Sequence, residues 1–195
     1  MKNSVKDVET FNKNISTFRE TSNNETGNNI FIDNDFKCIN FDNVKEEYSK
    51  DIKKYYSQGI NIDDPYSVDA LVISDSGYYF IEFKDAVIDS KQKKTIISKG
   101  KDSIVMFSDI VDSAVKNSRK DSEFILVYNK EKNERELNNK SRIKIAKSFL
   151  QEKGKEELVL FGVNKLRGMY YKDVHTFDKD EFIEFLSKNN ISYVE

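Results

Sequence analysis

The chain has 195 residues, of which 37% are hydrophobic and 34% charged, with a formal net charge of -2. That length suffices for one domain with a sizeable core, and the composition is typical of a soluble globular protein. No run approaches the roughly 18 apolar residues of a membrane helix, and the first ten residues lack a signal-peptide core. Cys38 is the only cysteine and His175 the only histidine, which excludes an internal disulfide, a multi-cysteine zinc site and a catalytic His pair. We expect one cytoplasmic domain over residues 1–195, in a reducing compartment and without a membrane.

The charges are unevenly distributed along the chain. Residues 61–90 hold seven acids and one base, whereas residues 91–120 hold eight bases and three acids. Residues 130–155 hold nine bases and four acids. An acidic centre between basic segments suits a metal site beside a channel for a polyanion. On charge alone, however, chance clustering in a Lys-rich chain is slightly the better explanation.

The first third of the chain predicts helices and a small hairpin. Apolar residues at helical spacing predict a helix over 4–18 and a second over 43–58 that ends at Gly59. The second helix has an apolar stripe formed by Val44, Tyr48, Ile52 and Tyr55. Between these helices, residues 29–41 predict a hairpin with its turn at 33–35. Cys38 alternates with Phe36 on this hairpin, so we expect it to be buried at least in part.

The remaining two thirds alternate strands with helices. A hairpin at 68–86 precedes a long helix over 91–120. The expected buried stripe of this helix consists of Ile104, Val105, Phe107, Ile110, Val111 and Ala114. Further elements follow in this order: a strand at 123–129, a helix from Ser141 to Leu150, strands at 157–163 and 168–177, and a helix begun by Asp178. This order predicts an α/β fold with a mixed central sheet flanked by helices on both faces.

The hairpin "VDALVISDSGYYFIEFKDA" carries charges where a core hairpin should carry none. Glu82 and Lys84 are two residues apart on one strand and therefore share a face. If the turn is built on "SDSG", paired residue numbers sum to 151, and Asp69 then lies opposite Glu82 on that face. A three-residue loop would pair Asp69 with Phe83 and send its carboxylate to the other face, unless a bulge restored it.

Two opposed carboxylates repel each other, and burial strengthens the repulsion. A divalent cation between the two carboxylates makes their close approach favourable, because Mg²⁺ prefers hard oxygen ligands. Lys84 would then face a metal-bound water or a phosphate. Asp69, Glu82 and Lys84 together are the equipment for metal-assisted hydrolysis of a phosphodiester, with Mg²⁺ or Mn²⁺ as cofactor.

The spacing Asp69, twelve residues, Glu82-Phe83-Lys84 resembles the active-site signature of the PD-(D/E)XK nuclease superfamily. The resemblance covers about 44–130 and implies a restriction-endonuclease-like fold, in which the acid ends one strand and E-x-K lies on the next. It implies that the backbone carbonyl of Phe83 joins Asp69 and Glu82 as a metal ligand. Val68 stands where the family usually has proline.

The resemblance also implies a further acid on the helix before the hairpin. Glu46, Glu47 and Asp51 compete for this role, and Glu47 is preferred because it borders the apolar stripe. A solvated helix face explains each of the three equally well.

The sequence thus predicts a Mg²⁺-dependent endonuclease with nucleic acid, expected to be DNA, as its partner; RNA stays open, as do a homodimer and a protein partner. Phage, defence and toxin settings fit equally. The alternative function is a non-catalytic immunity or regulatory protein that retained the fold, although an intact set of Asp69, Glu82 and Lys84 argues against it. A separate structural interpretation is a hairpin with one solvated polar face, on which Glu82 and Lys84 are ordinary surface residues.

Overall fold

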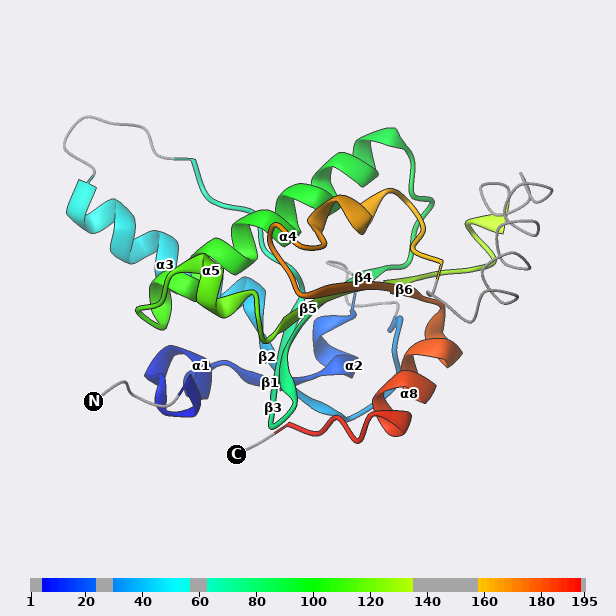
Figure 1. Cartoon of the computed structure of the whole chain (residues 1–195), viewed down its shortest axis with the longest axis horizontal. Coiled ribbons are helices and arrows are strands. Elements are labelled where there is room, and N and C mark those ends of the chain that lie inside the picture. Colours follow the sequence, from blue (N-terminus) through cyan, green and yellow to red (C-terminus); the bar gives the residue numbers. More distant parts are fainter. Residues whose placement is uncertain (1–4, 24–29, 57–62, 135–157, 194–195) are drawn as a thin grey trace.

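A computed structural model describes residues 5–23, 30–56, 63–134 and 158–193 (Figure 1). Its helices are η1 (Val5–Asp7), α1 (Glu9–Lys13), α2 (Phe18–Thr21), α3 (Phe41–Tyr56), α4 (Ser90–Ile110), α5 (Val115–Ser118), η2 (Val163–Leu166) and α8 (Lys179–Lys188). Its strands are β1 (Ile15–Thr17), β2 (Lys37–Asn40), β3 (Ala70–Ser74), β4 (Gly77–Lys84), β5 (Ser122–Tyr128) and β6 (Asp173–Phe177). None of the described helices is long and apolar enough to cross a membrane.

The strands form one mixed sheet in the order β1-β2-β3-β4-β5-β6. Neighbours from β1 to β4 pair antiparallel, whereas β4 with β5 and β5 with β6 pair parallel. Two parallel strands need a long crossover, and α4 with α5 provides it between β4 and β5. The predicted mixed α/β sheet is confirmed.

Helices cover the two faces of the sheet in separate groups. Figure 1 shows α4 with η2 on one side, and α2 with α8 on the other. The α4 side buries residues such as Leu71, Phe80, Ile104, Phe107 and Phe124. The α8 side buries residues such as Val72, Ile81, Ile125, Val127 and Phe182. Because strand side chains alternate, each central strand contributes to both cores, which explains its continuous apolar sequence.

The hairpin β3–β4 has the predicted register. Ile73 pairs with Tyr78 and Ala70 with Ile81, so the paired numbers sum to 151. Ser74 also pairs with Gly77, which leaves a turn of two residues. Gly77 has φ +147°, and a Cβ there would lie 2.5 Å from the carbonyl oxygen of Asp121. Only glycine therefore allows the hairpin turn to approach β5 this closely.

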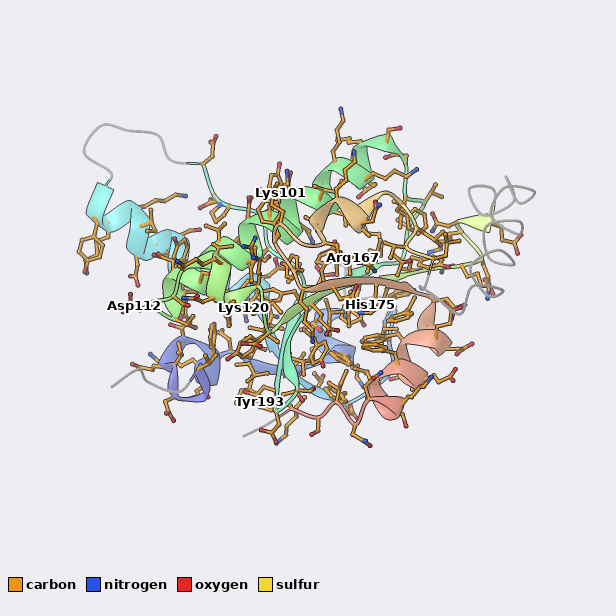
Figure 2. All side chains as sticks on the ribbon, in the orientation of Figure 1. Lys101, Asp112, Lys120, Arg167, His175 and Tyr193 are labelled. Carbon is orange, nitrogen blue, oxygen red and sulfur yellow. The ribbon has the colours of Figure 1, made fainter. Side chains whose placement is uncertain are left out.

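Several other elements are also as predicted. β5, the end of the strand predicted at 168–177, and α8 are all present, and Asp178 forms a capping box with Glu181. Cys38 is fully buried, and burial raises the pKa of its thiol to about 12. Figure 2 labels His175 on β6; its ring stacks on Phe177 and contacts Phe185 of α8.

The N-terminal predictions are corrected. The single helix over 4–18 is replaced by η1, α1, β1 and the start of α2, because Ile15 pairs with Ile39 in the sheet. The strand β2 pairs with β1 and β3, so the hairpin predicted at 29–41 does not form. Pairing with the sheet has overridden the local helical spacing.

Two later predictions are wrong and one lies outside the described residues. Residues 158–162 form no strand, and η2 follows them. Within the predicted apolar stripes, Tyr55 is 75% and Val105 48% exposed, and Ala114 is exposed as well. The helix predicted from Ser141 to Leu150 lies outside the described part of the chain.

Candidate functional site

The candidate site lies at the end of the β3–β4 hairpin opposite its turn, on the α4 side of the sheet. Asp69 directly precedes β3 rather than lying within it, and Glu82 and Lys84 are on β4. Glu82 follows Phe80 by two residues and therefore faces the same core, below α4. The predicted convergence of Asp69 and Glu82 on one face is confirmed by the contacts that follow.

A single ammonium group joins the two carboxylates. Lys99 Nζ, from α4, lies 3.0 Å from Asp69 Oδ1 and 2.8 Å from Glu82 Oε2. Lys84 Nζ lies 3.7 Å from the other oxygen of Glu82, Oε1. The two carboxylates thus share the ammonium of Lys99, and Glu82 has a second cation, Lys84, at ion-pair distance.

Burial differs sharply within this cluster. The side chain of Glu82 is fully buried, whereas those of Asp69, Lys99 and Lys84 keep 14%, 18% and 20% of their surface exposed. Glu82 is therefore shielded from solvent, whereas Asp69 and the two lysines reach solvent in part.

Hydrogen bonds fix the position of Asp69. Its Oδ2 accepts the backbone N–H of Phe83 at 2.6 Å, and its carbonyl oxygen accepts the N–H of Phe41 at the start of α3. The preceding N–H of Val68 donates to Ser103 Oγ on α4. The chain at Asp69 is thus attached to β4, α3 and α4 together.

These attachments bring a third acid, from α3, to the site. Asp42, in the first turn of α3, accepts a hydrogen bond from Ser67 Oγ. Its charge acts on both Asp69 and Lys99, where it raises the pKa of each. Glu47 instead accepts a hydrogen bond from Asn14 at 3.2 Å, in the segment after α1. Among the acids of α3, Asp42 therefore acts on Asp69 and Lys99, whereas the preferred Glu47 bonds to Asn14 and its role at the site stays a prediction.

Burial and mutual repulsion perturb the carboxylates. Burial, followed by the charge of Asp69, raises the pKa of Glu82 to about 8. Burial raises the pKa of Asp69 as well, despite the attraction of Lys99. For Lys99, burial lowers the pKa, but the charges of Glu82 and Asp69 outweigh it, so the net shift is upward. The ammonium of Lys99 therefore stays charged and favours ionised carboxylates, whose own burial opposes ionisation.

One buried polar atom lacks a hydrogen bond. Glu82 Oε1 is inaccessible to solvent and has no hydrogen-bond partner among the described residues. Lys84 Nζ, at 3.7 Å, is too distant for such a bond. An unsatisfied buried carboxylate oxygen costs free energy, and a cation or an ordered water would remove that cost.

The donors present are suited to a hard divalent cation, although they are few. Asp69 and Glu82 supply carboxylate oxygens, including the unsatisfied Oε1, and the ammonium of Lys99 lies where one ion would contact both. Within the described ranges, no group of three or more His, Cys, Asp or Glu residues is arranged to hold a metal ion. Mg²⁺ usually keeps several waters, so two carboxylates and a carbonyl are a sufficient protein contribution.

Sequence reasoning missed both Lys99 and Asp42. Lys99 lies three residues after the buried Ile96 and four before the buried Ser103, on the buried side of α4. A lysine at such a position needs an acidic partner, and this signal could have located it. No comparable signal marks Asp42, because its nearness to Asp69 depends on the bond between Phe41 and Asp69.

No family model, curated protein or solved structure matches the chain. The geometry of the site and the chemistry of its residues therefore carry the functional conclusion.

Proposed function

We propose that this protein is a metal-dependent nuclease that hydrolyses phosphodiester bonds, with DNA as the expected substrate. The observation that carries the proposal is the meeting of Asp69 and Glu82 around one cationic group, with Lys84 beside them. A hairpin followed by a crossover helix and a parallel strand is the arrangement that the resemblance to the PD-(D/E)XK superfamily implies.

Asp69 and Glu82 are the residues that would hold Mg²⁺ or Mn²⁺, with the backbone carbonyl of Phe83 as a further ligand. When bound, such an ion polarises a phosphoryl oxygen and lowers the pKa of a coordinated water. The bond from the N–H of Phe83 to Asp69 Oδ2 keeps the carboxylate aligned with β4. Asp42 adds negative charge that favours a cation at this position.

Lys84 provides positive charge on the solvent-exposed side of the site. Its side chain is one-fifth exposed, so its ammonium group can reach a water or a phosphate oxygen at the surface. There it would orient the attacking water or stabilise the charge that develops on the phosphoryl group. Glu82 is fully buried, so little water surrounds its carboxylate. The low local dielectric constant strengthens the interaction of this carboxylate with any cation.

The basic start of α4 suits a polyanionic substrate. Lys91 and Lys93 lie on its first turn, with Lys91 exposed, on the same helix as Lys99. Lysine acts toward phosphate as a point charge, so these residues would hold a nucleic-acid backbone without reading its sequence. Their position supports nucleic acid as the partner.

A second function is favoured by a specific observation. Lys99 and Lys84 already supply two positive charges beside the two carboxylates, so the fold does not require a metal ion for stability. This arrangement also suits a non-catalytic immunity or regulatory protein that retained the fold. The unsatisfied Oε1 of Glu82 favours the nuclease over the non-catalytic protein. A site that had lost its catalytic role would have no physical reason to keep a buried carboxylate oxygen without a hydrogen bond.

The deciding experiment incubates the full chain with plasmid and single-stranded DNA and RNA, in Mg²⁺, Mn²⁺ or chelator. We expect cleavage that needs the divalent cation and that Glu82→Ala abolishes. Glu47→Ala is the matched control. It also replaces a glutamate by alanine, but the carboxylate that it removes bonds to Asn14. If the wild-type protein cuts none of these substrates in either metal, the non-catalytic function replaces the nuclease. Cleavage retained by Glu82→Ala would place the active site elsewhere.

A further inference from the structure

Lys99 is the one component of the cluster that neither the resemblance nor the proposed chemistry accounts for. It projects from the middle of the 21-residue helix α4. The next residue, Gly100, lies so close to the sheet that a Cβ there would meet Leu166 at 2.7 Å and Phe124 at 3.1 Å. The hydroxyl of Tyr171 also donates to the Gly100 carbonyl at 2.6 Å. The backbone at Lys99 is therefore held firmly, and any movement must come from its flexible side chain.

The ammonium of Lys99 lies where a cation would contact both carboxylates. Its Nζ is the only described group that bonds to Asp69 and to Glu82 together. It nevertheless satisfies only one oxygen of Glu82, since Oε1 stays without a hydrogen bond. With 18% of its surface exposed, the side chain also has a path to solvent beside Lys84. Lys99 is therefore attracted to both carboxylates by charge, but it leaves one oxygen of Glu82 without a hydrogen bond.

The charges of the cluster do not permit Lys99 and a divalent cation to share this position. Two unit positive charges 3–4 Å apart repel by several kcal/mol at the effective dielectric constant of a protein surface, and a divalent ion doubles that repulsion. Asp69, Glu82 and Asp42 carry at most three negative charges, against four positive charges for a divalent ion together with Lys99 and Lys84.

We propose that Lys99 is an internal counter-cation that occupies the metal position in the metal-free protein and is displaced by the divalent cation. This proposal rests on the proposed function, because it assumes a metal site at Asp69 and Glu82. Displacement moves the ammonium toward solvent on the side of Lys84, where an anionic phosphate binds. Metal and nucleic acid therefore assist each other: the metal releases Lys99, and the phosphate holds it in its released position.

The first test compares Mg²⁺ and Mn²⁺ binding by calorimetry in wild-type protein, Lys99→Met and Lys94→Met. Methionine keeps the length of the side chain and removes its charge. Lys94 is the control, because it is exposed on the same helix. We expect Lys99→Met to bind the ion at least about tenfold more tightly, since a competing unit charge has been removed. Lys94→Met should bind it like the wild-type protein.

A second measurement uses unmodified wild-type protein and so does not depend on the folding of Lys99→Met. Lysines are acetylated briefly with and without saturating Mg²⁺, and each site is quantified by mass spectrometry. We expect the acetylation rate of Lys99 to rise several-fold with Mg²⁺, because the amine leaves its ion pair. The rate at Lys94 should not change.

The outcomes separate this proposal from the nuclease. If Mg²⁺ binds the wild-type protein and supports cleavage while the acetylation of Lys99 and the affinity of Lys99→Met stay unchanged, the exchange is refuted and the nuclease stands. If Mg²⁺ raises the acetylation of Lys99 and Lys99→Met binds the ion more tightly, but the wild-type protein cuts no substrate, the exchange is supported and the nuclease is refuted. If neither protein binds a divalent ion, both proposals are refuted.

Discussion

Lys99 of α4 and Glu82 of β4 form a partly buried ion pair, with Nζ 2.8 Å from Oε2, although 17 residues separate them in the chain. Asp69 joins the same ammonium group from a position 30 residues away. The apolar hairpin accommodates two carboxylates because α4 supplies one positive charge through Lys99 and β4 a second through Lys84. Removing one partner of such a pair leaves an uncompensated buried charge, whereas the intact pair is nearly neutral in stability.

Glu82→Gln should change how stability depends on pH. The pKa of Glu82 is 4.5 ordinarily and about 8 in the folded protein. Between these values the folded protein holds a proton that the unfolded chain has released, so stability falls as pH rises from about 5 to 8. Glutamine removes this loss and still leaves Lys99 paired with Asp69. We expect urea unfolding in chelator to show Glu82→Gln gaining at least about 1 kcal/mol on the wild-type protein over this range.

A stability difference between Glu82→Gln and wild type that stays constant from pH 5 to 8 would contradict the raised pKa of Glu82. Lys101→Met, on the same helix but with its ammonium over the ring of Tyr170, is the control. It should shift the wild-type curve without changing its slope.

Lys84→Ala should impair catalysis without removing the metal site. The ammonium contacts Glu82 only at 3.7 Å, so Asp69 and Glu82 stay in place when it is lost. Single-turnover cleavage at saturating metal should slow by roughly 10²–10³, the usual effect of losing one charge-stabilising donor. Calorimetry should show Mg²⁺ still bound. Loss of Mg²⁺ binding in Lys84→Ala would mean that this lysine supports the site structurally.

Asp42→Asn and Glu47→Gln should differ, although both remove an acidic charge from α3. Asp42 bonds to Ser67 and acts on Asp69 and Lys99, so its loss should weaken metal affinity by about tenfold, as expected for a residue that supports a metal ligand. Glu47 bonds to Asn14 instead, and its substitution should leave metal affinity unchanged. Metal titrations of the two variants check this, and equal losses would return Glu47 to the site.

Gly100→Ala should destabilise the protein and disturb the site together. The added Cβ would lie 2.7 Å from Leu166 and 3.1 Å from Phe124, so α4 or its neighbours must shift. Overpacking of this kind costs about 1–3 kcal/mol, against a gain in helix propensity of about 1 kcal/mol. Thermal unfolding should show a net loss, and Lys94→Ala, on the exposed face of α4, should show none. A stabilised Gly100→Ala would mean that α4 is less tightly packed than described.

Local patterns determined much of the fold and part of the site. The alternation of β3 and β4 and their short turn set a register in which Asp69 and Glu82 share a face. The continuous apolar run of β5 and the capping box at Asp178 likewise act over a few residues. Such features depend on neighbours in the chain, so the sequence alone was enough to predict them.

Only the tertiary structure decided which further charges reach the carboxylates. Lys99 arrives because α4 crosses back over the sheet and packs closely at Gly100, and Asp42 arrives because the N–H of Phe41 bonds to the carbonyl of Asp69. The same long-range pairing turned Ile15 from a predicted helix into a strand beside Ile39. An ion pair across 17 or 30 residues depends on how whole elements pack, and periodicity along the chain contains no information about that distance.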